Sequence, residues 1–325
     1  MRPKIILFLL FLSPSFLFAN KIEILFSNGG IHLSGTLLIP ESEGAHPAIV
    51  LLHGSGPSER SEYRAIAQKF TDAGFVTLIY DKRGSGKSEG SWIHASLDDL
   101  ANDASAAISF LQTRPEVTPE CIGVWGVSQA GWIVPIIKNP FQFLIVITGG
   151  GASPLETEMY GYEMEWNHSG FSDDEKVEAR KLLRQYFDYL RTGQNRTELL
   201  QVIEESKKKR WYSTLSLERI LPSEEDRKNW SWVAEYDPVP GIQKLKMPTL
   251  LLFGGKDFQT PTEIAVKKWK QALTEAQNPD FTIRVFPDAA HAMTKGEHTA
   301  ATHGLFVPEY FETMISWLNE HVKCK

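Results

Sequence analysis

The residues around Ser128 form the pattern in this chain that is best suited to chemistry. The apolar run 122–125 leads into Gly126, and Ser128 is followed by Ala130 and Gly131. Where a strand turns sharply into a helix, small flanking residues let a serine adopt a strained backbone conformation that lifts its hydroxyl out of the sheet. The pattern predicts a nucleophilic serine, with Ala130 at a position where such turns usually have glycine.

The segments that would position this serine alternate between apolar runs and amphipathic stretches. Strands followed by helices are typical of a mostly parallel sheet with both faces covered, so the predicted fold class is α/β. We expect strands at 21–26, 31–39, 48–52, 76–80, 122–125 and 143–148, and helices at 63–73 and 97–111.

The alternation stops at about residue 152 and resumes after residue 245. The 152–245 segment has helical signals instead, with Ser172 and Glu175 forming a capping-box pattern and Gly193 ending that helix. Its many Trp and Tyr residues either line a site or form a small core of the segment itself. Further expected elements are a second helix at 197–211 within the segment, and after it strands at 249–253 and 281–286, a helix at 264–273 and a final helix ending near 321.

Together, these stretches resemble an α/β-hydrolase of the bacterial esterase and serine-aminopeptidase-like group, which is also dienelactone-hydrolase-like. The resemblance implies an α/β-hydrolase core at 20–151 and 246–325, with 152–245 as an inserted helical lid. It covers essentially the whole chain after residue 19 and is weakest in the lid. It is carried by the serine turn and by the stretches 52–57, 80–88, 253–261 and 286–293.

The resemblance also indicates the partners of the serine. A serine hydroxyl is a weak nucleophile until a base removes its proton, and that base needs a carboxylate to fix its tautomer. In this fold the chain order is serine, acid, histidine, which selects Asp257 and His291. Both residues follow predicted strands, where open α/β sheets place their sites.

Other acids and histidines are weaker candidates. We expect His53 to be structural, Asp81 to fix its loop by hydrogen bonds with Arg83 and neighbouring backbone, and Asp237 to form a turn. Asp288 is too close in sequence to His291 to orient it. The remaining candidates, expected near the last helix and at the surface, are His298, His303 and His321.

An acyl-transfer site also needs donors for the developing oxyanion. The backbone N–H of Gln129, directly after the serine and at a helix start, would supply one. The N–H of Ser55 would supply the other, because Gly54 and Gly56 permit a close approach of the backbone.

Composition and charge exclude several other classes. The 34 basic and 40 acidic residues give a net charge of −6, and no long basic block is present, so a nucleic-acid partner is not expected. No histidine, cysteine or carboxylate cluster has metal-ligand spacing, and the loop 84–88 lacks a glycine that a phosphate loop requires. The sequence therefore predicts neither a metal nor a cofactor.

Residues 1–19 predict a secretory signal peptide, with Arg2 and Lys4 before an apolar run and cleavage after about Ala19. An uncleaved N-terminal anchor is the alternative interpretation. The prediction is an exported protein, periplasmic or secreted, with no stable membrane insertion after cleavage. An oxidising compartment would permit one disulfide, but we expect Cys121 to be a small buried apolar residue rather than a partner of Cys324.

These residues predict a serine hydrolase that cleaves carboxylic esters through an acyl-enzyme, acting on a small-molecule acyl ester or a short peptide. Ser128 would attack, His291 would transfer the proton and Asp257 would orient His291. A serine aminopeptidase-like peptidase and an acyl thioesterase are alternatives on the same triad, and a non-catalytic binding protein of this fold is the alternative from another class. In the peptidase a substrate ammonium would be held by an acidic group of the lid, for which the candidates are Glu156, Glu158, Glu163 and Glu165.

Overall fold

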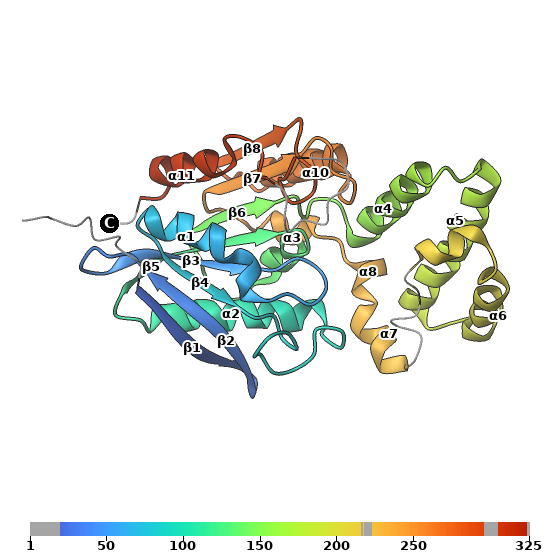
Figure 1. Ribbon diagram of the computed structural model, residues 1–325, viewed down its shortest axis with the longest axis horizontal. Coiled ribbons are helices and arrows are strands. Elements are labelled where there is room, and N and C mark those ends of the chain that lie inside the picture. Colours follow the sequence, from blue (N-terminus) through green and yellow to red (C-terminus); the bar gives the residue numbers. More distant parts are fainter. Residues whose placement is uncertain (1–19, 216, 218–222, 296–304, 324–325) are drawn as a thin grey trace, which may run out of the picture.

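The computed structural model describes residues 20–215, 217, 223–295 and 305–323. Its centre is an eight-stranded sheet in the order β1-β2-β4-β3-β5-β6-β7-β8 (Figure 1). β1 pairs with β2, and β2 with β4, in antiparallel fashion, whereas every pairing from β4 through β8 is parallel. The strands are β1 (Asn20–Asn28), β2 (Ile31–Ile39), β3 (His46–Leu52), β4 (Val76–Tyr80), β5 (Val117–Val127), β6 (Phe143–Ile147), β7 (Thr249–Gly254) and β8 (Phe281–Phe286).

Helices cover both faces of this sheet, which confirms the predicted α/β class. On β3, Val50 and Leu52 belong to the hydrophobic cluster of one face, while Ile49 and Leu51 belong to that of the other, because successive strand residues point to opposite faces. One cluster includes α2 (Leu97–Gln112), α3 (Ala130–Ile133), η2 (Val134–Ile136), α9 (Val239–Ile242) and α10 (Thr262–Glu275); the other includes η1 (Arg60–Tyr63), α1 (Arg64–Asp72) and α11 (Tyr310–His321).

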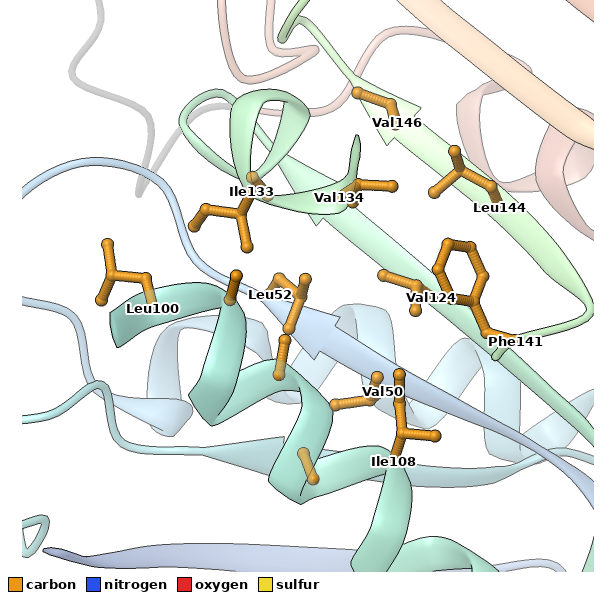
Figure 2. Packing of buried hydrophobic residues seen from close by; sticks show 14 of the residues in the cluster. Val50, Leu52, Leu100, Ile108, Val124, Ile133, Val134, Phe141, Leu144 and Val146 are labelled. Atoms are coloured by element: carbon orange, nitrogen blue, oxygen red, sulfur yellow. The ribbon is translucent and has the colours of Figure 1, made fainter. Parts of the chain in front are cut away.

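The core beneath the carboxyl ends of β3 and β5 is densely packed. Figure 2 shows Val50 and Leu52 of β3 beside Leu100 and Ile108 of α2, with Val124 of β5 next to them. All of these side chains except Leu100 are at most 1% exposed. The carboxyl ends of β3 and β5 are thereby held on a rigid base, from which the loops that follow them extend.

The segment between β6 and β7 contains helices with a hydrophobic cluster of their own. As predicted, Ser172 and Glu175 form a capping box, and Gly193 ends the helix with a left-handed φ of 72°. Most of its buried aromatic rings, such as Trp166 and Tyr189, pack within this cluster. The elements are α4 (Pro154–His168), α5 (Asp173–Thr192), α6 (Arg196–Ser206), η3 (Arg210–Thr214), α7 (Glu224–Trp230) and α8 (Trp232–Glu235).

Two details of this segment differ from expectation. The second helix, expected to reach residue 211, ends at Ser206, because the chain turns through η3 to bury Trp211 among the rings of the cluster. At the other end, Ile242 and Leu245 pack into the main core, so the separate cluster does not extend to residue 245. The described helices lack the combination of length and apolar character that crossing a bilayer requires.

The expectation for Cys121 was wrong. The residue is 1% exposed, as expected for a small buried side chain, but it is disulfide-bonded. The only other cysteine of the sequence, Cys324, lies outside the described residues. An apolar run in the sequence predicts the burial of a cysteine but carries no information on its pairing.

Candidate active site

Ser128 directly follows β5 and has the strained backbone predicted for it. Its φ is 55°, in the left-handed region that non-glycine residues rarely occupy. Its N–H donates to the carbonyl oxygen of Ile147 at 2.9 Å, and its own carbonyl accepts from the N–H of Gly131 at 2.9 Å. These two bonds hold the turn in a conformation that directs the side chain away from the sheet.

Small residues around the turn leave no spare room. A Cβ on Gly126 would lie 2.5 Å from the Cβ of Ala130, which explains why alanine is accommodated there: Gly126 supplies the space. A Cβ on Gly149 would lie only 2.1 Å from the carbonyl oxygen of Ser128. Gly149 therefore allows the end of β6 to approach the back of the serine turn.

We expect Gly149→Ala to lower the free energy of unfolding by about 1–3 kcal/mol, because the added Cβ clashes with backbone that has little room to move. The melting temperature should fall accordingly. Thermal unfolding of the purified variant measures it. Gly161→Ala, within α4, is the matched control: the nearest contact of the added Cβ would be the carbonyl oxygen of Gln259 at 3.9 Å, so the melting temperature should stay equal or rise. A Gly149→Ala variant that melts with the wild type would contradict this packing.

Asp257 and His291 come together from the loops after β7 and β8. The Nδ1 of His291 lies 2.9 Å from Oδ2 and 3.1 Å from Oδ1 of Asp257. The side chain of Asp257 is 0% exposed. Its Oδ1 also accepts from the backbone N–H groups of Gln259 and Thr260, both at 2.8 Å. The carboxylate is therefore fixed from its own loop and presents an oxygen to the imidazole.

The other ring nitrogen of His291 is the one left for chemistry. Its Nε2 is buried and has no hydrogen-bond partner among the described residues. Ser128 and His291 line the same cavity, which has a volume of about 620 Å³. With Nδ1 engaged by Asp257, Nε2 can accept the proton of a nucleophile in that cavity. Hydrogen bonds between nucleophile and base are often long without substrate and tighten in the complex.

Two threonines that the sequence interpretation missed hold the histidine loop. The hydroxyl of Thr148, directly after β6, donates to the carbonyl oxygen of His291 at 2.5 Å. The hydroxyl of Thr260 donates to the carbonyl oxygen of Thr148 at 3.0 Å. The position of Thr148 at a strand end beside Gly149 was the available signal for its role. These bonds tie the base to the strand next to the serine turn.

The predicted oxyanion donors lie on either side of Ser128. A Cβ on Gly54 would be 3.5 Å from the Cβ of Ser128, so the loop that carries Ser55 passes directly over the serine. Ser55 itself lines the cavity. Neither the N–H of Ser55 nor that of Gln129 donates to another backbone group of the described loops and turns. Of the two, only Ser55 is among the residues that line the cavity, and Gln129 is 3% exposed.

His53 is structural, as expected. It is buried, and its Nε2 lies 2.6 Å from the carbonyl oxygen of Tyr80. Burial, assisted by the nearby charge of Lys82, lowers the pKa of His53 to about 3. The ring is therefore neutral at ordinary pH and occupied in holding the end of β4.

Asp81 fixes its loop through backbone N–H groups, as expected, but not through Arg83. Its carboxylate accepts from the backbone N–H groups of Arg60 at 2.9 Å and Lys87 at 3.0 Å. Arg83 instead points toward α2 and donates to both oxygens of the buried Asp103, each at 2.7 Å. The expected bond between Asp81 and Arg83 was wrong, because a buried carboxylate on a neighbouring helix competes for the guanidinium.

The remaining competitors lie away from the serine. Asp237 accepts the backbone N–H two residues further on at 3.0 Å, as expected for a turn, and Asp288 pairs with a lysine at 3.0 Å. His321 is a half-buried residue of α11 whose Nδ1 contacts Asp280 at 2.7 Å. His298 and His303 lie outside the described residues.

The cavity has apolar walls with acidic groups among them. Tyr63, Trp132, Tyr162 and Phe258 supply rings, so one lid aromatic, Tyr162, does line the site. No lysine or arginine is among the lining residues. The acidic side chains that reach the cavity are Glu62, Glu158 and Glu165.

The lid glutamates divide into two faces of α4. Glu158 and Glu165, spaced seven residues apart and so on one face, line the cavity. Glu156 is held by Lys268 at 2.6 Å, and Glu163 pairs with Arg180. Of the four candidates for an ammonium site, the structure brings two to the serine and removes two from it.

Within the part of the chain that the structure describes, no group of three His, Cys, Asp or Glu side chains is arranged to hold a metal ion. The chemistry that the observed arrangement supports is nucleophilic acyl transfer by Ser128, with His291 as base.

A mostly parallel sheet with a strained serine, a buried aspartate and a histidine at its carboxyl edge defines an α/β-hydrolase. Within that class, the chain belongs to the X-Pro dipeptidyl-peptidase (S15) family, which matches residues 29–299.

Curated relatives and solved structures agree with this class. The chain is 28% identical over 277 residues to "Esterase EstD" of Thermotoga maritima, a match that covers 82% of this chain and 59% of that protein. It is 31% identical over 113 residues to the quorum-quenching protein AidA of Acinetobacter baumannii, covering 34% of this chain and 36% of that one. The chain thus spans less than two thirds of the length of these relatives.

Among solved structures, the esterase Pf2001 of Pyrococcus furiosus superposes with a TM-score of 0.61 at 16% identity, covering 94% of this chain and 92% of that one. Acetyl xylan esterase 1 of Thermoanaerobacterium superposes with a TM-score of 0.57 at 17% identity, covering 94% and 84% of the two chains. At these identities the likeness concerns the fold.

Proposed function

We propose that this protein hydrolyses carboxylic esters through a covalent acyl-enzyme formed on Ser128. The observation that carries the proposal is the buried, unpartnered Nε2 of His291, whose other nitrogen is held by Asp257, in the cavity that Ser128 lines. The likeness to an esterase from Thermotoga maritima supports the choice of ester substrates.

In the proposed reaction, the Oγ of Ser128 attacks the acyl carbon while its proton passes to Nε2 of His291. The carbonyl oxygen becomes an oxyanion that accepts hydrogen bonds from the N–H groups of Ser55 and Gln129. His291 then returns the proton to the leaving alkoxide, which departs as an alcohol. A water molecule, deprotonated by His291, attacks the acyl carbon; the bond to Oγ breaks, the acid is released, and His291 returns the proton to Oγ of Ser128.

The test is a panel of nitrophenyl esters of graded acyl length, run beside aminoacyl-arylamides, with a fluorophosphonate probe to count reactive serines. We expect one labelled serine and faster turnover of esters than of amides. A chain that reacts with the probe but cleaves only thioesters or only arylamides would overturn the ester assignment. A chain that the probe leaves unlabelled would indicate a binding protein.

A peptidase is the second candidate, favoured by membership of the S15 family and by Glu158 and Glu165 at the cavity. A carboxylate close to the acyl site could hold the ammonium of a peptide amino terminus. In that case Glu158→Gln and Glu165→Gln should raise KM for substrates with a free amine about tenfold or more, while KM for neutral nitrophenyl esters stays unchanged.

The comparison of free-amine and N-acetylated arylamides measures this effect. Glu163→Gln is the matched control, because Glu163 lies on the same helix but pairs with Arg180 outside the cavity. If the N-acetylated substrates are cleaved as well as the free amines in all variants, the two cavity glutamates hold no ammonium.

We further propose that the protein is exported after removal of residues 1–19. The apolar run after Arg2 and Lys4 supports this, and so does the disulfide at Cys121, since disulfides persist mainly in oxidising compartments. Amino-terminal sequencing of the protein from its native host should find Asn20 first. An intact Met1 on a cell-internal protein would contradict the proposal.

A further inference from the structure

Lys82 is a buried lysine that the proposed mechanism does not use. It follows β4 and is 3% exposed. Burial lowers the pKa of Lys82 to about 7, although Asp103 opposes that shift. Asp103 is itself engaged by Arg83, and no carboxylate among the described residues lies within ion-pair distance of Lys82. Even with much of its charge lost, a buried amine is costly unless its N–H groups are hydrogen-bonded, so packing alone does not account for a lysine here.

The amine of Lys82 instead donates to two neutral groups beside Ser128. Its Nζ donates to the carbonyl oxygen of Gly54 at 2.8 Å and to Oε1 of Gln129 at 2.8 Å. These acceptors lie on the two separate loops that carry the oxyanion donors. Lys82 is therefore the side chain that connects one half of the oxyanion site to the other.

The hydrogen bond from Lys82 to Gly54 acts directly on the backbone N–H of Ser55, one of the two predicted oxyanion donors. The carbonyl of Gly54 and the N–H of Ser55 belong to one planar trans peptide, in which the C=O and N–H point in opposite directions. Fixing the oxygen of Gly54 therefore fixes the direction of the Ser55 N–H. At Gln129, the held side chain and the donor N–H share a Cα.

We propose that Lys82 is a positioning residue for the oxyanion, which sets the two N–H donors in place by holding Gly54 and Gln129 together. The inference rests on the proposed acyl-transfer function. It predicts that Lys82 contributes where the substrate oxygen carries negative charge, and not to binding of the uncharged ground state.

The test compares Lys82→Met with the wild type in kcat, in KM, and in the Ki of a trifluoromethyl ketone, which forms a tetrahedral oxyanion adduct on a serine. Removing an oxyanion donor outright lowers kcat by about 10²–10³. We expect the loss of its positioning to lower kcat by about 10–100-fold, to raise Ki by a similar factor, and to change KM less than twofold.

Rates are expressed per serine labelled by the fluorophosphonate probe at completion, so that a partly unfolded preparation does not imitate a slow enzyme. Gln129→Met keeps its backbone N–H and loses only the held amide; we expect a smaller loss of kcat, still more than twofold, with a rise in Ki by a similar factor. This variant replaces Lys82→Met as the test if that one does not fold. Lys268→Met is the control, because this lysine binds Glu156 away from the cavity. It should match the wild type.

The inference is overturned if kcat per labelled serine stays within twofold of the wild type in Lys82→Met, or in Gln129→Met where that variant is the one tested. It is also overturned if kcat falls while Ki is unchanged, since that would indicate a general structural role. The wild type is assayed first on esters and arylamides. If only arylamides are cleaved, the ester proposal fails and the variants are compared on arylamides instead. If neither class of substrate is cleaved, the ester proposal and the inference about Lys82 both fail.

Discussion

Replacing Ser128 by alanine is expected to abolish turnover and leave the fold intact. The change removes one oxygen from the turn after β5 and leaves its backbone hydrogen bonds to Ile147 and Gly131 in place. Loss of a triad serine lowers kcat by about 10⁶ in the analogous subtilisin case. The measurement is kcat on a nitrophenyl ester beside the melting temperature, which should stay close to that of the wild type.

The control for this variant is Ser61→Ala, which removes the hydroxyl of an exposed serine and should change neither quantity. Fluorophosphonate labelling should disappear in Ser128→Ala and persist in Ser61→Ala. Residual activity above about a hundredth of the wild type, or labelling that persists in Ser128→Ala, would mean that another residue is the nucleophile.

The second large effect is expected at Asp257. In Asp257→Asn the amide oxygen can still accept the N–H groups of Gln259 and Thr260, so the loop should fold as before. The amide group favours the wrong imidazole tautomer of His291, and kcat should fall by about 10⁴. The melting temperature and kcat of the purified variant test the two halves of this expectation separately.

Asp81→Asn and Asp237→Asn are the matched controls. In Asp81→Asn one of the two oxygens that accept backbone N–H groups becomes an NH2, so one hydrogen bond is lost and stability should fall by about 0.5–1.5 kcal/mol. In Asp237→Asn the amide oxygen can keep the single bond from the N–H of Val239, so stability should change little. Both variants should keep kcat near that of the wild type. An active Asp257→Asn, together with a folded but inactive Asp81→Asn or Asp237→Asn, would identify a different acid.

The parts of the site that local sequence patterns determine are those whose geometry depends on a few neighbouring residues. The turn at Ser128 needs only a strand, small flanking residues and a helix start, all within about ten positions, and the structure has it with a φ of 55°. The capping box of Ser172 and the stop at Gly193 are equally local. Strand periodicity likewise predicted the parallel sheet, and with it the edge at which Asp257 and His291 lie.

Other features depend on which face of an element meets the core. On α4 the spacing alone groups Glu158 with Glu165 and Glu156 with Glu163, but which pair faces the serine is decided by how α4 docks. In the same way Arg83 had two acidic candidates nearby, and its bond to Asp103 exists because α2 packs beside the end of β4.

Local patterns were sufficient to predict the fold class and the serine turn, because hydrophobic periodicity and steric limits on short turns act within a few residues. Asp257 and His291 were indicated by the chain order of the α/β-hydrolases that the sequence resembles. The disulfide at Cys121, the choice of glutamates at the cavity and the partners of Lys82 become apparent only in the folded chain. Lys82 reaches Gly54 and Gln129 across 28 and 47 residues of chain. Contacts at such separations arise from the docking of whole strands and helices, to which no local pattern is sensitive.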